Sequence, residues 1–315
     1  MKQYNFLPLF LLSLVFLFLP GNSYYETLNL TPAAAKESLG GVFPSLPSLP
    51  QKRLEMPIAL SAKASLLLDY SSGVVLWRQN EEEKLPPASL TKLITALIVL
   101  EEMEPEQVVT INRVENYGQV MGLTIGEQMK VGDLLEALLI FSANDAAYAL
   151  ADAYPGGREA FISRANARVQ ELGLKNTHFV NPNGEDNPAH YSTAWDLARL
   201  AQRLWRFEKF RQIISQNQTL VCDVNGLTCH PLYTTDELLG QFPGLVGGKT
   251  GFTEQAGECF LSFWETDGIR LLSVVLGSGD RFGDTQKLLQ WGLASFTYSP
   301  VEAVSFIQEE SMAGR

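Results

Sequence analysis

The segment that most constrains this 315-residue chain runs Lys84-Leu-Pro-Pro-Ala-Ser-Leu-Thr-Lys-Leu-Ile-Thr-Ala-Leu-Ile-Val-Leu-Glu101. Its two prolines hold the first residues extended, and the pattern from Ser89 onward predicts a helix with almost no polar face before Glu101. A helix that is apolar all round is a buried helix. We therefore expect this segment to lie at the centre of a hydrophobic core.

Strand-like runs occur on both sides of this helix along the chain. Residues 65–70 and 74–79 are rich in strand formers and flank Ser71-Ser72-Gly73, which predicts a tight antiparallel pair. Further strands are predicted in the last third of the chain, at 245–250, 259–264 and 270–276. Amphipathic helices are predicted at 131–140, 146–152, 158–172, 193–205 and 284–296. Strands at both ends with helices between them predict one α+β domain whose sheet joins the termini.

Composition and charge exclude two classes of protein. With 46% hydrophobic and 19% charged residues, the chain has an ordinary globular composition and is not disordered throughout. Its formal net charge of -11 repels a polyanion, so we exclude nucleic acid as a partner.

The N-terminus has the pattern of an export signal over residues 1–23. Lys2 precedes an apolar run at 6–20, and small residues follow it at 21–23. The run is shorter than the roughly 20 residues that cross a bilayer as a helix. We expect cleavage after about Ser23 and membrane attachment only if the segment stays uncleaved. Residues 24–56 carry spaced prolines and are predicted to form an extended linker.

Cysteine and histidine spacing gives no sign of a metal site. The chain has three cysteines in an expected oxidising compartment: Cys222, Cys229 and Cys259. Cys222 and Cys229 flank a short turn, where a disulfide and two free thiols are both compatible with the sequence. His178, His190 and His230 show no His-x-x-x-His spacing, and the cysteines show no Cys-x-x-Cys. We expect no metal and no cofactor.

Ser89 and Lys92 are the first candidates for chemistry. They lie about one turn apart at the start of the buried helix, so their side chains should meet. The helix N-terminus favours an alkoxide at Ser89, and burial lowers a lysine pKa towards that of a usable base. A capping serine with an exposed lysine is the alternative, but the helix offers Lys92 no solvent face. A buried unpaired charge is costly and therefore usually functional.

Ser142-Ala143-Asn144 follows one predicted helix and precedes another, so it lies in a connection between them. A second hydroxyl beside an acid/base lysine relays a proton, and a carboxamide can hold both the lysine and a substrate carbonyl. Ser215-Gln216-Asn217 has the same Ser-x-Asn pattern, but it ends an amphipathic segment, and we interpret it as a helix terminus.

Lys249-Thr250-Gly251 ends a predicted strand in which Gly247 and Gly248 leave room for another backbone. A strand edge here could align a peptide by β-augmentation, with Lys249 and Thr250 binding a terminal carboxylate. A strand end with an exposed lysine is the alternative.

Taken together, the three motifs carry a family resemblance. Ser-x-x-Lys, Ser-x-Asn and Lys-Thr-Gly occur in this order, and the chain resembles the low-molecular-mass penicillin-binding proteins, which are serine D-alanyl-D-alanine carboxypeptidases. The resemblance extends over about residues 57–298 and is strongest at 60–64, 84–92, 176–184 and 247–253. It implies the β-lactamase/transpeptidase-like fold, an antiparallel sheet of about five strands flanked by helices.

The resemblance also implies roles for single residues. Ser89 would be acylated by the penultimate D-alanine of a peptidoglycan stem pentapeptide, with Lys92 as general base and Ser142 passing a proton to the departing D-alanine. β-Lactam antibiotics would inhibit by acylating the same serine. The substrate-binding residues would be Asn144, Lys249, Thr250, Gly251, Phe252 and Arg281. Among these, Phe252 would contribute its backbone N–H, with that of Ser89, to the oxyanion hole, and Arg281 would help to hold the terminal carboxylate.

The chain departs from many members of this family at its C-terminus. Only the short, acidic tail 299–315 follows the region that resembles the family, so we expect neither a second β-rich domain nor a basic membrane anchor. The resemblance places the protein outside the cytoplasm, in the periplasm or cell envelope, with a role in peptidoglycan synthesis and cell shape.

Three other functions use the same fold. A serine β-lactamase needs an added carboxylate, for which Glu185 is the candidate, but Ala189 stands where an orienting Asn would be needed. A D,D-endopeptidase that cleaves cross-links uses the same groups as a carboxypeptidase. An inactive cell-wall scaffold would keep the fold without the chemistry.

Overall fold

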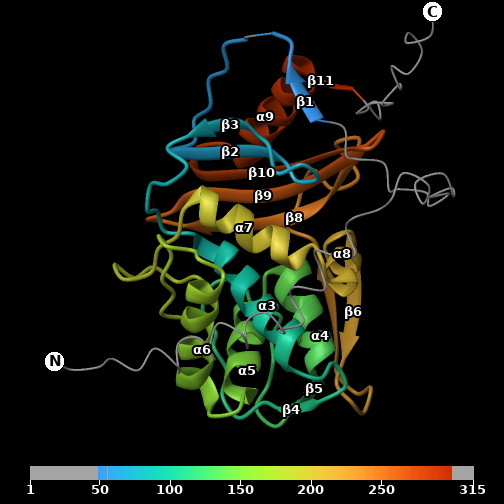
Figure 1. The fold of residues 1–315 in the computed structure, drawn as a ribbon. Coiled ribbons are helices and arrows are strands. Elements are labelled where there is room, and N and C mark those ends of the chain that lie inside the picture. The colour runs from blue at the N-terminus through green and yellow to red at the C-terminus, as the bar shows by residue number, and fades with distance from the viewer. Residues whose placement is uncertain (1–48, 55, 300–315) are drawn as a thin grey trace, which may run out of the picture. The chain divides into compact units, whose positions relative to one another are not determined.

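In the computed structural model, which describes residues 49–54 and 56–299, a five-stranded antiparallel sheet lies between two helical layers (Figure 1). The strand order is β3-β2-β10-β9-β8. The strands are β2 (Ala64–Asp69), β3 (Val75–Gln79), β8 (Leu245–Thr253), β9 (Gly257–Thr266) and β10 (Ile269–Ser278). Because β2 pairs with β10, the sheet joins the two ends of the domain as predicted, and the α+β class with about five strands is confirmed.

Both faces of the sheet are covered, which explains why every residue of the inner strand β2 is buried. Leu66 and Leu68 of β2 face the larger core on the side of α7 (Ala194–Leu204). Leu67, which points the other way, packs in a second core with α9 (Arg281–Ser295). Figure 1 shows α7 and α9 on opposite sides of the sheet.

The helical region is built around α3 (Lys92–Glu102), whose residues 92–99 are all buried. This confirms the prediction of a helix that is apolar all round. The other helices are α4 (Val131–Glu136), the π-helical η3 (Ala137–Phe141), α5 (Asn144–Ala153), α6 (Gly157–Glu171) and α8 (Glu208–Ile214). Within the described ranges, no helix has the length and apolar character needed to cross a membrane.

Two further antiparallel pairs of short strands lie outside the main sheet. β4 (Val108–Thr110) pairs with β5 (Gln128–Lys130), and β6 (Gln218–Cys222) pairs with β7 (Cys229–Tyr233). The second pair decides between the two possibilities for the cysteines, because Cys222 and Cys229 form a disulfide across it. Cys259 is a buried free thiol.

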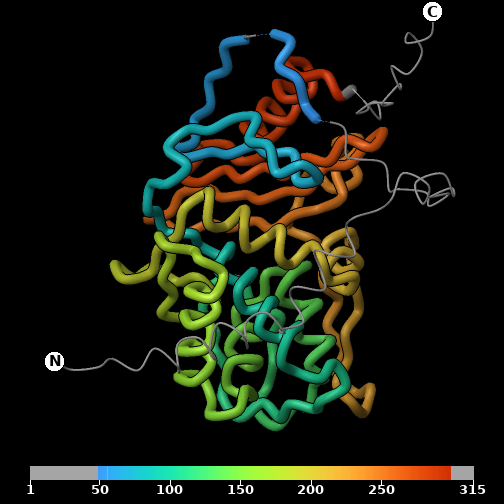
Figure 2. The backbone as a smooth tube through the Cα atoms, viewed as in Figure 1, coloured from blue at the N-terminus to red at the C-terminus, as the bar shows by residue number. Residues whose placement is uncertain are grey.

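The ends of the described chain pair with each other, as Figure 2 shows in blue and red. β1 (Leu49–Lys52) is antiparallel to β11 (Phe296–Ser299). The four residues of β1 lie inside the linker predicted at 24–56, and they form a strand there. Pro50 has no N–H to donate, but an edge strand tolerates this. The signal segment predicted at 1–23 and most of the predicted tail at 299–315 lie outside the described residues.

Candidate active site

Ser89 lies in a single 3₁₀ turn, η2 (Ala88–Thr91), directly before α3. The predicted helix therefore starts three residues late as an α-helix, at Lys92. In a 3₁₀ turn, side chains three residues apart eclipse each other, and Lys92 Nζ lies 2.8 Å from Ser89 Oγ. Ala88 has a φ of 47°, a left-handed conformation that costs about 1 kcal/mol or more for a residue with a side chain. The backbone is thus strained where it presents the partly exposed Ser89.

The Lys92 amino group is fully buried and has three acceptors. They are Ser89 Oγ at 2.8 Å, Asn144 Oδ1 at 2.7 Å and the backbone carbonyl of Asn183 at 2.8 Å. Burial lowers the pKa of Lys92 to about 7, against the opposing effect of the nearby carboxylates of Glu185 and Asp145. A lysine with this pKa can accept a proton from Ser89 near neutral pH.

Ser142 ends the π-helical turn η3 in a left-handed conformation, with a φ of 64°. The predicted connection between two helices is confirmed, except that Asn144 is already the first residue of α5. We expected Ser142 beside the acid/base lysine, and its Oγ accepts a hydrogen bond from the other lysine of the site, Lys249, whose Nζ lies 2.7 Å away. Ser142 and Asn144 therefore contact different lysines.

The N-terminus of α5 is fastened to a loop that sequence reasoning missed. Asn144 Nδ2 donates to the carbonyl of Tyr117 at 2.9 Å, which leaves Asn144 Oδ1 oriented towards Lys92. Asp145 accepts hydrogen bonds from three successive backbone N–H groups of the same loop, those of Met121, Gly122 and Leu123. No motif or periodicity marks these contacts in the sequence.

Lys249 is the second buried lysine, on the edge strand β8. Its Nζ donates to Ser142 Oγ and, at 2.9 Å, to the carbonyl of Thr250. Burial lowers the pKa of Lys249 well below its usual range, and the positive charges of Lys92 and Arg281 add to the effect. The hydroxyl of Thr250 lies 2.5 Å from that of Thr235.

Strand β8 packs against the turn that carries Ser89. A Cβ atom at Gly251 would lie 3.0 Å from the backbone nitrogen of Ser89, so only glycine fits without a shift. Arg281 begins α9 and donates from Nη1 to the carbonyl of Gly251 at 3.2 Å. Phe252 follows with its side chain 57% exposed. The structure thus brings the sequence-predicted site residues together, while Ser215 ends α8 as predicted.

The segment 181–185 completes the surroundings of Lys92 and was missed as part of the site. Gly184, with a φ of +96°, packs on the nucleophile turn, where a Cβ atom would lie 1.9 Å from the carbonyl oxygen of Ala88. The sequence signals for it were the turn-like Asn-Pro-Asn-Gly at 181–184, the family resemblance at 176–184 and the carboxylate of Glu185, and none of them indicated a contact with Lys92.

His190 also lies beside the site. Its Nδ1 accepts from the backbone of Val180, so Nε2 carries the proton and donates to Thr91 Oγ1 at 2.7 Å. Burial lowers the pKa of His190 to about 4, which keeps the ring neutral.

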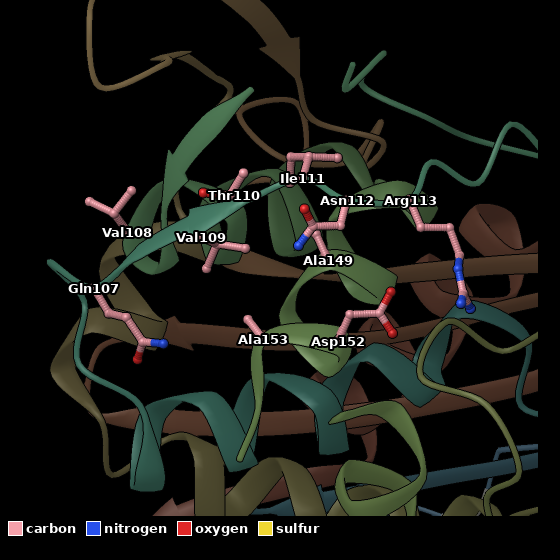
Figure 3. Close-up of a pocket in the computed structure, with 10 residues that line it drawn as sticks. All are labelled: Gln107, Val108, Val109, Thr110, Ile111, Asn112, Arg113, Ala149, Asp152 and Ala153. Carbon is pink, nitrogen blue, oxygen red and sulfur yellow. The ribbon is translucent and has the colours of Figure 1, made fainter. Parts of the chain in front are cut away.

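Two hollows lie away from these residues. The first lies between β4 and the C-terminal end of α5, and Figure 3 shows its lining of residues 107–113 with Ala149, Asp152 and Ala153. The second is lined by Tyr70, Trp205 and four arginines of α6, α7 and the turn that follows. Neither contains a residue of the three motifs.

Known proteins resemble this chain over most of the described residues. A model of the D-alanyl-D-alanine carboxypeptidase family matches residues 51–280. The chain is 31% identical to the D-alanyl-D-alanine carboxypeptidase DacF of Bacillus subtilis over 78% of its own length, and it spans 65% of that protein. It is 34% identical to DacC of Escherichia coli, covering 80% of this chain and 66% of DacC.

A solved structure gives the same result. The crystal structure of a D-alanyl-D-alanine carboxypeptidase from Mycobacterium tuberculosis superposes with a TM-score of 0.72 at 29% identity. The match covers 78% of this chain and 95% of that one.

Proposed function

We propose a function on the premise that this chain belongs to the D-alanyl-D-alanine carboxypeptidase family. The protein removes the terminal D-alanine from peptidoglycan stem pentapeptides through an acyl-enzyme on Ser89. The observation that carries the proposal is the position of Lys92, a buried lysine with a pKa of about 7 and its Nζ 2.8 Å from a partly exposed serine hydroxyl.

The acylation step follows from this contact. Ser89 Oγ attacks the carbonyl carbon of the penultimate D-alanine while neutral Lys92 takes the hydroxyl proton. The backbone N–H groups of Ser89 and Phe252 stabilise the oxyanion, an effect of about 3 to 4 kcal/mol per donor in acyl-transfer enzymes. The C–N bond then breaks, and the leaving D-alanine receives, through Ser142, the proton that Lys92 took from Ser89, so that Lys92 is neutral again. Water hydrolyses the ester on Ser89 and regenerates the enzyme.

The strand β8 and its neighbours bind the substrate in this proposal. β8 is an edge strand, so its free side can pair with an extended peptide. Lys249, Thr250 and Arg281 hold the terminal carboxylate, and Asn144 holds the peptide carbonyl. β-Lactam antibiotics occupy the same position and acylate Ser89.

The substrate lies outside the cytoplasm, and the export signal expected at residues 1–23 agrees with a periplasmic or cell-envelope location. The membrane is a partner only if that segment stays attached.

The test is release of D-alanine from a cell-wall pentapeptide by the full chain, with Ser89→Ala as the matched control. We expect release by the wild type and none by the variant, together with a long-lived penicillin adduct in the wild type alone. An adduct without release, with cleavage of cross-linked muropeptide dimers, would replace the proposal with a D,D-endopeptidase. Rapid penicillin turnover would indicate a β-lactamase, and neither release nor adduct would indicate a scaffold.

A further inference from the structure

Glu185 links two parts of the site, and both of its carboxylate oxygens are engaged. Oε1 accepts a hydrogen bond from Asn183 Nδ2 at 3.0 Å, and Oε2 accepts one from the hydroxyl of Tyr148 at 3.1 Å. Burial and the carboxylate of Glu185 raise the pKa of Tyr148, so its hydroxyl keeps the donated proton. The guanidinium of Arg158 lies 4.1 Å from the centre of the Tyr148 ring and covers it.

The two partners of Glu185 belong to the two segments that hold Lys92 from opposite sides. Tyr148 lies on α5, one turn after Asn144, whose Oδ1 accepts from Lys92. Asn183 accepts from Lys92 through its own carbonyl. Glu185 therefore connects the two segments that supply Lys92 with acceptors other than Ser89 itself.

The segment that Glu185 holds also contacts the helix and the nucleophile turn directly. Thr95 of α3 donates to the carbonyl of Pro182 at 2.7 Å. Gly184 packs on the backbone of Ala88. A shift of this segment would therefore move both the acceptor of Lys92 and the support of Ser89.

We infer that Glu185 is a positioning residue for acyl transfer, which joins the 181–185 segment to α5 and so holds Lys92 in line with Ser89. The inference rests on the proposed function. Asn183 and Tyr148 each donate one hydrogen bond to the carboxylate of Glu185, and these two contacts fix its position between the two segments.

The charges around Lys92 determine how the pH profile responds. Glu185 and Asp145 are the carboxylates that raise the pKa of Lys92 against its burial. Lys249 faces Lys92 from the strand β8, and the charge of Lys92 adds to the burial that lowers the pKa of Lys249, while burial keeps His190 neutral. Removing the charge of Glu185 therefore lowers the pKa of Lys92. Since the neutral amine is the base, the acid limb of the acylation profile moves to lower pH.

The experiment measures the rate constant for acylation of the full chain by a fluorescent penicillin on both sides of neutral pH. For Glu185→Gln we expect the plateau rate to fall about tenfold, as for loss of one hydrogen bond to a charged group, and the acid limb to move to lower pH. Tyr148→Phe should lower the plateau several-fold and leave the acid limb in place. The matched control is Glu106→Gln, which removes a carboxylate that is 82% exposed and forms an ion pair at the surface. We expect this variant to keep both the plateau rate and the acid limb of the wild type.

The outcomes separate the inference from the proposed function. A wild-type protein that forms no adduct overturns the proposed function. An adduct in the wild type with an unchanged rate and profile in Glu185→Gln overturns the inference alone. A variant that acylates normally but keeps its adduct far longer would identify Glu185 as the deacylating base and also overturn it. Thermal melting of each variant identifies any that fail to fold, in which case Tyr148→Phe carries the test.

Discussion

The site has two walls, and each buries a lysine in a different way. The helical wall consists of η2, α3 and the start of α5, and the strand wall consists of β8 and the start of α9. Lys92 on the helical wall is held by acceptors from three separate segments. Lys249 on the strand wall is held by Ser142 and by the carbonyl of its own neighbour Thr250.

The charges on the two walls also differ. Two carboxylates, Glu185 and Asp145, partly offset the burial of Lys92, so its pKa stays near neutrality. Lys249 lies near Arg281, and its nearby carboxyl is that of Asp236, whose own pKa burial raises to about 6. The helical wall is therefore arranged to exchange a proton near pH 7. On the strand wall, burial and the neighbouring positive charges favour the neutral form of Lys249, and the carboxylate of a bound substrate would stabilise its charged form.

The largest effect is expected on the helical wall. Lys92→Gln removes the base, and we expect penicillin acylation to slow by about a thousandfold, within the usual range for a general base. In the wild type, the rate should rise as pH increases through about 7, because Lys92 loses its proton there, and the variant should lack this rise. Stopped-flow or gel-based adduct formation measures both quantities.

Lys92→Arg is the matched control for charge. Arginine does not lose its proton in proteins, so this variant should be as slow as Lys92→Gln. Acylation by either variant within tenfold of the wild type would assign the base to another residue and remove the distinction between the walls.

A smaller effect is expected on the strand wall, and it should depend on the substrate. Lys249→Gln removes a charge that pairs with the substrate carboxylate, and we expect kcat/KM for a pentapeptide to fall about a hundredfold, mostly in KM. A pentapeptide with a C-terminal amide has no such charge, so the variant should process it nearly as well as the wild type does. Equal losses on the acid and the amide would place Lys249 in the chemical step.

Local sequence patterns were sufficient for each wall taken alone. The apolar run within residues 93–100 predicted the buried helix α3, and the run at 245–250 predicted the strand β8. Ser89 and Lys92 were predicted to meet because helical geometry brings residues three apart together. These predictions depend on neighbours within one or two turns.

Contacts between the walls could not be predicted in the same way. Spacing does not reveal which lysine Ser142 reaches, and the structure places it on Lys249 from 107 residues away. Glu185 and Tyr148 are 37 residues apart and have no shared periodicity. The β1–β11 pair was missed because a short segment that contains Pro50 has the composition of a linker, and its partner strand is equally short.

The smallest effect on chemistry is expected from the disulfide hairpin behind the helical wall. β7 packs on η3, which leads to Ser142, but Cys222 and Cys229 touch neither lysine. Replacing both cysteines by serine removes the covalent closure of the loop between them, whose ends are separated by 7 positions in the sequence. The loss of loop constraint should cost about 2 kcal/mol and lower the melting temperature by roughly 5 °C.

Acylation by penicillin and the preference for the acid over the amide substrate should both stay within about twofold of the wild type in this double variant. Wild-type protein treated with reductant is the control, because it should melt at the lower temperature without any change of sequence. If acylation slowed together with the loss of stability, the hairpin would be needed to hold η3 and Ser142 in place. The helical wall would then include the disulfide hairpin. The two walls would differ in what supports them, since the hairpin would hold the helical wall and the main sheet holds the strand wall.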